Sequence, residues 1–190
     1  MELFEYIAIA FSLVFSFTVM RLVSGLPYAT RPGRVYWVHL LFLIAFLLWV
    51  VNAFWAAWSY HAVEWSYLGY ILALSSPAAM YYVAVILVPA EPAEITSWRD
   101  YYYTVRRRAF VGFGLLALVG ALSNVVLLGM PTLHPARLAE LGNFLAAIVG
   151  FSFEDHRVHA ALAVLALASV LAVGMVLLAQ PGALGMAFEG

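Results

Sequence analysis

Cysteine and lysine are both missing from this chain of 190 residues, and each absence excludes a class of chemistry. Without cysteine there is no disulfide, iron–sulfur cluster, c-type haem attachment or thiol nucleophile. Without lysine there is no Schiff base, which excludes a retinal protein or a pyridoxal enzyme, and no P-loop with its phosphate-binding lysine. All nine basic residues are therefore arginines.

Charge is also scarce. Charged residues make up 10% of the sequence and hydrophobic residues 66%, and the mean hydropathy is +0.97. A soluble domain has about 45–50% apolar and about 25% charged residues, so no soluble fold could bury this much apolar surface. The net charge of −1 provides no basic surface for a nucleic acid. The composition predicts an all-α integral membrane bundle that forms a single domain over residues 1–190.

Long apolar runs give the expected number of membrane spans. A helix needs about 20 apolar residues to cross a bilayer. Five stretches meet this requirement, namely residues 3–26, 35–58, 67–88, 109–130 and 158–179. A sixth, 138–153, has 16 residues and would rise only about 24 Å, so it is either a short span or a re-entrant segment. Glu2 and Glu5 stand where a signal peptide would be basic, and we expect no cleaved leader.

The arginines predict the orientation, because cytoplasmic loops are enriched in basic residues. If the amino terminus lies outside and all six segments cross, Arg137 alone lies outside. The inner side then holds eight arginines: Arg21, Arg31, Arg34, Arg99, Arg106, Arg107, Arg108 and Arg157. If the fifth segment does not cross, Arg157 changes sides, and the side of the carboxyl terminus stays open. We expect a multi-pass protein of the bacterial cytoplasmic membrane with its amino terminus outside.

The segment 89–108 is the longest polar stretch and predicts an interfacial amphipathic helix. Ser97 followed by Asp100 is a capping pattern for a helix start. Apolar and basic residues then alternate at helical spacing, which predicts one face in the acyl boundary and one toward headgroups. The helix either anchors the next span or binds a lipid or a partner protein. The residues concerned are Trp98, Arg99, Tyr101, Tyr102, Arg106, Arg107 and Arg108.

Polar residues at membrane depth are functional candidates, because they are costly in hydrocarbon. Arg21, Asn52 and Asn124 are the residues that we expect to line or gate a polar path. Arg21 could instead extend to the inner interface, or pair with Glu154 or Asp155. The two asparagines could instead serve only helix packing through interhelical hydrogen bonds.

The histidines permit two ligand hypotheses. On the inner side, a transition-metal site could use three histidines and nearby carboxylates, from the set His39, His156, His159, Glu154 and Asp155. His39 and His61 are about 33 Å apart along a helix, which resembles a two-haem arrangement. Each haem b would need a second histidine at its depth, and His134 is the one candidate on the outer side. Our main expectation is that no cofactor is bound.

A short pattern occurs twice and suggests an internal repeat. Gly25-Leu26-Pro27 follows the first span, and Gly129-Met130-Pro131 follows the fourth. Each is followed by a further proline and an arginine. This spacing predicts inverted three-helix halves, 1–88 and 109–180, linked by a cytoplasmic loop at 89–108.

Several short motifs carry a family resemblance. These are Phe4-Glu5-Tyr6, Arg21-Leu22, Ser24-Gly25-Leu26, the run 36–41 (YWVHLL) and the run 106–110 (RRRAF). Together they resemble a family of small polytopic bacterial inner-membrane proteins. The resemblance implies a bacterial origin and a multi-span bundle, and it implies no particular activity.

These features favour a small membrane channel or secondary transporter that acts as a homo-oligomer, since one bundle of this size has little room for a polar path. The alternative is an accessory or scaffolding subunit of a larger membrane complex. A third hypothesis is a haem- or metal-bearing electron-transfer protein. No nucleophile elbow, zinc-protease helix or Walker loop occurs in the sequence, so we do not expect an enzyme. The expected partners are membrane lipids and a second membrane protein or another copy of this chain.

Overall fold

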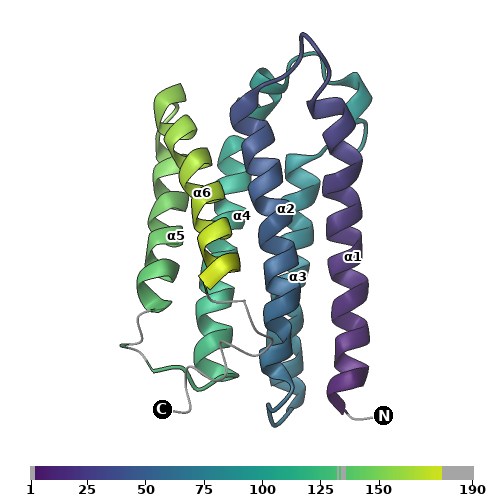
Figure 1. The fold of residues 1–190 in the computed structure, drawn as a ribbon, viewed down its shortest axis with the longest axis vertical. Coiled ribbons are helices and arrows are strands. Elements are labelled where there is room, and N and C mark those ends of the chain that lie inside the picture. The colour runs from purple at the N-terminus through teal and green to yellow at the C-terminus, as the bar shows by residue number, and fades with distance from the viewer. Residues whose placement is uncertain (1–2, 132, 134–135, 177–190) are drawn as a thin grey trace.

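The computed structural model describes residues 3–131, 133 and 136–176, and within them the chain is helical (Figure 1). Two short 3-10 helices, η1 and η2, accompany the α-helices, and the described residues include no strand. The elements in order are α1 (Leu3–Ala29), α2 (Trp37–Ala56), η1 (Ala57–Tyr60), α3 (Tyr67–Leu87), η2 (Pro92–Glu94), α4 (Trp98–Val126), α5 (Ala136–Ser152) and α6 (His156–Val176).

Five of the six helices are long and apolar enough to cross a membrane, and α5, with 17 residues, is too short to meet that criterion. This agrees with the sequence, which predicts a short fifth segment. In the structure α5 lies antiparallel to α4 along its whole length. Asn124 near the end of α4 bonds to Glu140 near the start of α5, and Arg106 near the start of α4 bonds to Gly150 near the end of α5. The helix therefore follows α4 from Asn124 to Arg106 as a single rod and has no re-entrant turn.

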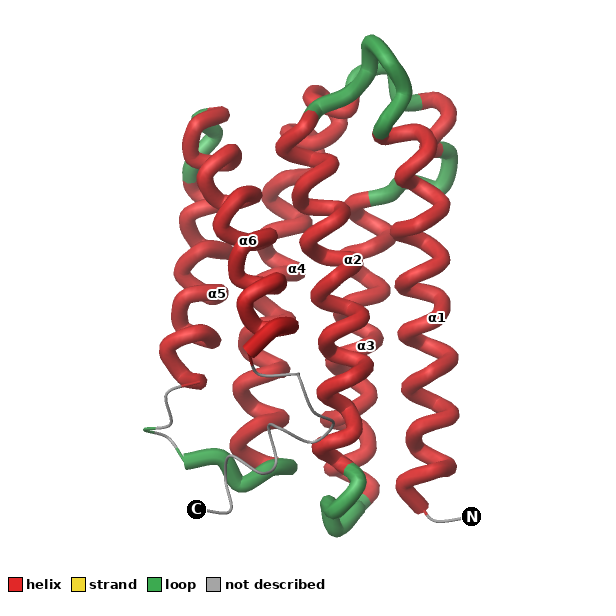
Figure 2. Tube along the Cα trace, in the orientation of Figure 1, coloured by secondary structure: helices red, strands yellow, loops and turns green. Residues whose placement is uncertain are grey.

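The connections define two ends of the bundle (Figure 2). The segments 30–36, 88–97 and 153–155 lie together at one end, which we call the arginine-rich end because the arginines from Arg21 to Arg108 and Arg157 lie toward it. The segment between α2 and α3 and the start of α1 lie at the opposite, amino-terminal end. Successive helices alternate in direction between these ends.

The start of α4 corrects the expectation of a separate interfacial helix. Ser97 caps the helix as predicted, since its Oγ accepts a hydrogen bond from the Asp100 N–H at 3.3 Å. However, the helix continues without a break from Trp98 to Val126, so the link between the proposed halves is 88–97 and not 89–108. Trp98 and Tyr102 are buried against the bundle, and Trp98 Nε1 donates to the Tyr28 carbonyl. The apolar face packs on protein because the first turns of α4 are enclosed by the ends of α1 and α2.

The two repeats of the Gly-x-Pro pattern differ in conformation. Gly25 and Pro27 lie inside α1, which continues to Ala29. Gly129 lies beyond α4 and has a φ of +63°, a left-handed conformation that suits glycine. The inverted repeat therefore remains a sequence prediction.

Close helix contacts depend on glycine at two places on α4 and α5. A Cβ added at Gly112 would lie 2.6 Å from a methyl group of Val83 on α3, and one added at Gly150 would lie 2.2 Å from the ring of Phe110 on α4. Small residues at such positions let membrane helices approach where no hydrophobic effect drives association. They join α3, α4 and α5 into one continuous layer.

Candidate functional site

A cavity of about 560 Å³ lies inside the bundle, and all six helices contribute to its wall. Its volume falls within the range of small-molecule sites, about 300–1,000 Å³. The wall is largely aromatic and aliphatic. Its rings are Phe11, Phe15, Phe42, Phe46, Trp49, Tyr60, Phe110 and Phe113.

The polar part of the cavity wall is uncharged. None of the described lining residues is an aspartate, glutamate, arginine or histidine. The polar side chains, apart from the indole of Trp49 and the phenol of Tyr60, are three asparagines and two serines: Asn52, Asn124, Asn143, Ser76 and Ser169. An ion in this space would have no opposite charge to compensate its lost hydration, so the wall suits an uncharged molecule.

Two of the asparagines are held by neighbouring helices. Asn52 on α2 donates from Nδ2 to the Val170 carbonyl of α6 at 3.0 Å. Asn124 on α4 donates from Nδ2 to Oε1 of Glu140 on α5 at 2.7 Å. Both bonds use the amide nitrogen, and each leaves an amide oxygen as an acceptor beside the cavity.

Arg137 and Glu140 form an ion pair beside this asparagine. Arg137 also donates to the carbonyl of Ala121 on α4 and to those of Met130 and Pro131 in the segment that follows α4. The carboxylate of Glu140 is thus neutralised by Arg137 and bonded to Asn124, and it adds no net charge near the cavity.

Pro77 leaves a further acceptor, the Ala73 carbonyl, on the cavity wall. Proline has no N–H, so inside α3 it cannot donate to the carbonyl of Ala73, one turn earlier. Both residues are buried and both line the cavity. The Ala73 carbonyl is therefore deprived of its helical donor at the wall itself.

Aromatic rings close the cavity toward the arginine-rich end. Phe42 and Phe110 line the cavity and meet edge to face, with ring centroids 5.7 Å apart. On their other side, Phe42 stacks on Tyr102 at 5.9 Å and Phe110 contacts His159 at 5.6 Å. The cavity floor thus rests directly on a layer of polar side chains.

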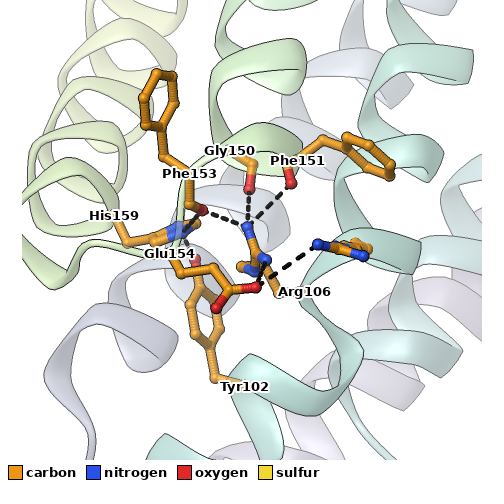
Figure 3. A network of polar contacts seen from close by, with 8 residues as sticks. Tyr102, Arg106, Gly150, Phe151, Phe153, Glu154 and His159 are labelled. Carbon is orange, nitrogen blue, oxygen red and sulfur yellow. Dashed lines mark hydrogen bonds and ion pairs between the residues drawn. The ribbon is translucent and has the colours of Figure 1, made fainter.

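That polar layer, which we call the closing layer, consists of Tyr102, Arg106, Glu154 and His159 (Figure 3). The hydroxyl of Tyr102 lies 2.7 Å from Nδ1 of His159, and Nε2 of His159 lies 2.9 Å from the Phe153 carbonyl. Because a carbonyl oxygen only accepts, Nε2 carries the hydrogen, and in the neutral ring Nδ1 accepts from Tyr102. The layer therefore fixes both the tautomer and the orientation of the histidine.

Arg106 joins α4 to α5 and to the turn that follows α5, and its side chain is 2% exposed. Its Nη1 donates to the carbonyls of Gly150, Phe151 and Phe153 at the end of α5, and its Nη2 contacts Oε1 of Glu154 at 2.5 Å. A helix ends with unpaired carbonyls and a partial negative charge, which a guanidinium satisfies well. Arg106 on α4 therefore caps α5 and holds the turn into α6.

A second group of polar side chains lies next to the closing layer. The hydroxyl of Tyr36 lies 2.9 Å from Nδ1 of His156 and 3.3 Å from the hydroxyl of Tyr103. Burial raises the pKa of the Tyr36 phenol above its ordinary value. Tyr36 is therefore protonated at neutral pH and can donate to His156, which links the start of α2 to the start of α6.

The structure separates the three residues expected to line or gate a path. Asn52 and Asn124 both line the cavity. Arg21 does not line it and instead donates from Nε to the Val88 carbonyl at the end of α3, at 3.1 Å. Glu154, one of its suggested partners, pairs with Arg106 and Arg107. Arg21 thus extends toward the arginine-rich end, the direction expected of an arginine that reaches the interface.

The histidines expected as metal ligands have different neighbours. His39 is buried and stacks on Trp98, with ring centroids 4.9 Å apart, and neither of its ring nitrogens makes a hydrogen bond to a described residue. His156 bonds to Tyr36 and His159 to Tyr102. Across 3–131, 133 and 136–176, no group of three or more histidine, aspartate and glutamate side chains is placed to hold a metal ion. The predicted metal site of these three histidines with Glu154 and Asp155 is therefore not assembled. His134, the candidate second haem ligand on the outer side, lies outside the described residues.

The expected lipid or partner surface is divided between the core and the outside. Trp98, Tyr102 and Arg106 are buried, and Tyr101 is partly buried with its hydroxyl donating to the Ile86 carbonyl at 2.7 Å. The exposed members of the set are three arginines: Arg99, Arg107 and Arg108. Arg107 pairs with Glu154 at 3.7 Å, whereas Arg99 and Arg108 can meet lipid headgroups or a partner.

Several site residues could not be identified from the sequence. Asn143, Ser76 and Ser169 line the cavity although nothing distinguishes them from packing residues along the chain. Arg106 belongs to a run of three arginines, and local spacing cannot show which one turns inward. The acidic residues Glu154 and Asp155, just before α6, indicate a partner for one of these arginines. They identify Arg106 only when α5 is known to run beside α4.

Comparison with protein families, curated proteins and solved structures finds no match to this chain.

Proposed function

We propose that this chain is a small secondary transporter whose solute is uncharged and occupies the cavity inside one bundle. The observation that carries the proposal is a cavity with asparagine and serine side chains and no ionisable residue except Tyr60, closed at one end by the closing layer. A closed end distinguishes a carrier from an open channel. The absence of charge on the wall argues against an ion as the solute.

The closing layer has the properties of a gate. It joins α4 to the turn between α5 and α6 through side-chain hydrogen bonds to a few carbonyl groups and one ion pair. Such contacts exchange more readily than a packed apolar core, and transporters move one group of helices against another around a central site. In this proposal the turn 153–155 moves away from Arg106, together with the helix ends that it joins.

The proposed topology has six crossings of a bacterial cytoplasmic membrane, with the amino terminus outside. The gathering of arginines at one end supports the assignment of that end to the cytoplasm. The antiparallel course of α5 along α4 supports a short crossing by α5, which places the segment after α4 outside and Glu154 inside.

The homo-oligomer expected from the sequence is not required by this proposal, because the cavity lies within a single chain. The alternative function, an accessory subunit of a membrane complex, has one observation in its favour, the exposed arginines Arg99, Arg107 and Arg108. A rigid bundle with no change of access would support that alternative.

The proposal is tested by the reactivity of a thiol in the cavity. The chain lacks cysteine, so Ser76→Cys introduces a single reporter on the α3 wall. In proteoliposomes of known orientation, we expect a small membrane-impermeant thiosulfonate to modify it from the outer side. In the Glu154→Gln background, we expect modification from the inner side to rise up to about fivefold, because the gate loses an ion pair whose carboxylate is 69% exposed and which contributes at most about 1 kcal/mol. Leu118→Cys, exposed on α4 and outside the cavity, is the control and should react from neither side.

Equal reaction from both sides in the unmodified background would contradict the carrier and indicate an open channel. Inner-side reactivity that does not change in Glu154→Gln would contradict the gate. No reaction from either side would show that the cavity is sealed and would favour the accessory subunit.

A further inference from the structure

Among the described residues, the cavity has an open side between α5 and α6. Every lining residue on α1 to α4, including the short η1, is buried or partly buried. The exposed lining residues all belong to α5 and α6: Ala139, Gly142, Asn143, Leu165, Ser169 and Val173. The cavity is therefore reached from the side of the bundle, between these two helices.

The packing of the two helices explains this opening. α5 packs chiefly against α4 and α6 chiefly against α2, and few contacts join α5 to α6. They meet at the arginine-rich end, where Arg106 holds their turn, and separate toward the amino-terminal end (Figure 1). Apolar side chains, such as Leu141 and Leu145 on α5 and Leu171 on α6, are exposed on these helices. In a bilayer such a side opening faces acyl chains along most of its length. It extends to Ala139 near the start of α5 and Val173 near the end of α6, so a reagent in the outer water can also enter it at the amino-terminal end.

The polar groups in the cavity favour a hydroxyl-bearing solute. The amide oxygens of Asn52 and Asn124 and the Ala73 carbonyl offer acceptors, and the hydroxyl of Ser76 makes no hydrogen bond to a described residue. These groups lie among aromatic rings that favour an apolar body. A buried site made for a hydroxyl discriminates strongly against an analogue that lacks it, because its polar groups are then left unpaired.

We propose that the solute is an uncharged amphiphile, with a hydrocarbon body and a hydroxyl head, that reaches the cavity from the bilayer through the opening between α5 and α6. This inference rests on the proposed function, since it names the class of solute for the same cavity. The body lies against the aromatic wall, and the head bonds to the acceptors on α2, α3 and α4. A charged head is excluded by the uncharged wall, and a large polar solute by its apolar area.

Three ligands that share one carbon skeleton and differ in their head group test the proposed class of solute. Farnesol has an uncharged hydroxyl head, farnesyl diphosphate a charged head, and farnesane no polar head. The full chain, purified in detergent, is mixed with each and examined by native mass spectrometry. We expect one farnesol per chain, with at least tenfold weaker binding of the other two. Equal retention of farnesyl diphosphate, or of farnesane, would overturn the proposal.

Two neighbouring substitutions on α5 locate the bound molecule. Gly142 lines the cavity and a Cβ built there meets no atom within 4 Å, so Gly142→Trp fills the space without an initial clash. Leu141 is exposed and is not a lining residue, so Leu141→Trp is the matched control. We expect Gly142→Trp to lose farnesol binding at least tenfold and Leu141→Trp to retain it. Unchanged binding in Gly142→Trp would contradict the assigned cavity.

A bridge across the opening tests the route. Gly142→Cys and Ser169→Cys place one thiol on each side, and bifunctional thiosulfonates of increasing length are applied in nanodiscs. We expect a bridge within one chain to slow farnesol uptake at least tenfold, with recovery after reduction. Bridges that form between chains would show that a second copy covers the opening, and uptake that is unchanged by a bridge within one chain would exclude this route.

Farnesol binding and thiol access at Ser76→Cys together distinguish the class of solute from transport itself. Farnesol binding without any change of access at Ser76→Cys would leave the site and contradict transport. A change of access without farnesol binding would leave transport and contradict this class of solute.

Discussion

Arg106 illustrates how one residue can determine both a fold and a function. A guanidinium has five N–H donors in a rigid plane, whereas an ammonium group has three. Here Nη1 meets three carbonyls at the end of α5 and Nη2 meets the carboxylate of Glu154. No neutral side chain could satisfy the same set, so the end of α5 depends on this arginine.

Replacement of Arg106 should destabilise the protein in a graded order. Interhelical hydrogen bonds in membranes contribute on average about 0.6 kcal/mol each, so the loss of four predicts a decrease of about 2 kcal/mol in the free energy of unfolding for Arg106→Leu. Arg106→Lys should lose about half of this, because it retains the charge but not the planar fork. Denaturant titration in detergent measures both. Arg108→Leu, at an exposed position, should change stability by less than about 0.5 kcal/mol, and an equal loss in all three variants would contradict the assignment.

Tyr102 offers a second test at the residue scale. Tyr102→Phe keeps the ring that stacks on Phe42 but removes the hydroxyl that bonds to His159. The expected loss of stability is about 0.6–1.7 kcal/mol, the range of such bonds in membrane bundles. Tyr67, a residue at 77% exposure, provides the matched Tyr67→Phe control with no expected loss. If the two variants unfold at the same denaturant concentration, the hydroxyl of Tyr102 does not contribute.

At the scale of the element, α5 combines a tightly packed end with an open end. Gly150 lies against the buried ring of Phe110, whereas Gly142 faces the open cavity. The same substitution should therefore have opposite effects at the two positions. Gly150→Ala forces a ring to move and should destabilise by about 1–3 kcal/mol. Gly142→Ala should be neutral or stabilising by up to about 1 kcal/mol, because alanine favours a helix.

Thermal unfolding of the two variants in the same detergent checks this pair. A destabilised Gly142→Ala, or an unaffected Gly150→Ala, would mean that α5 is rotated relative to its position here.

The start of α4 shows what local sequence can predict about an element. The cap at Ser97 was predictable because capping depends on neighbouring residues in the chain. The periodicity also placed Trp98 and Tyr102 on one face. It could not show what covers that face, because the carbonyl of Tyr28 and the ring of Phe42 are brought there only by the tertiary fold. The prediction of lipid contact at Trp98 and Tyr102 was therefore wrong, whereas the predicted helix start was correct.

At the scale of the molecule, composition and apolar runs predicted the helical bundle well. The bilayer sets the length and the hydropathy that a spanning helix needs, and both properties can be read from the sequence. The cavity was not predictable, because it results from the way α5 and α6 separate, and no single residue marks it. Asn52 and Asn124 were selected for their polarity, and both line the cavity; Arg21 was selected for the same reason and lies outside it.

The number of crossings is tested by labelling on the two sides of α5. Leu133, at 96% exposure, lies before α5, and Ser152 is exposed at its end. With six crossings, a membrane-impermeant maleimide should modify Leu133→Cys from outside the cell and Ser152→Cys only after the membrane is opened. Asp100→Cys, at the start of α4, serves as an inner reference. If both sites on α5 react from the same side, α5 does not cross.

If the arginine-rich end opens and closes as a gate, the distance across that end takes two values, and spin labels can measure both. Spin labels are attached at Val35→Cys, before α2, and Ser152→Cys, at the end of α5, both on exposed residues. Double electron–electron resonance in nanodiscs should give two distance populations, with the longer one increased by Glu154→Gln. A single narrow distribution that Glu154→Gln leaves unchanged would contradict the account.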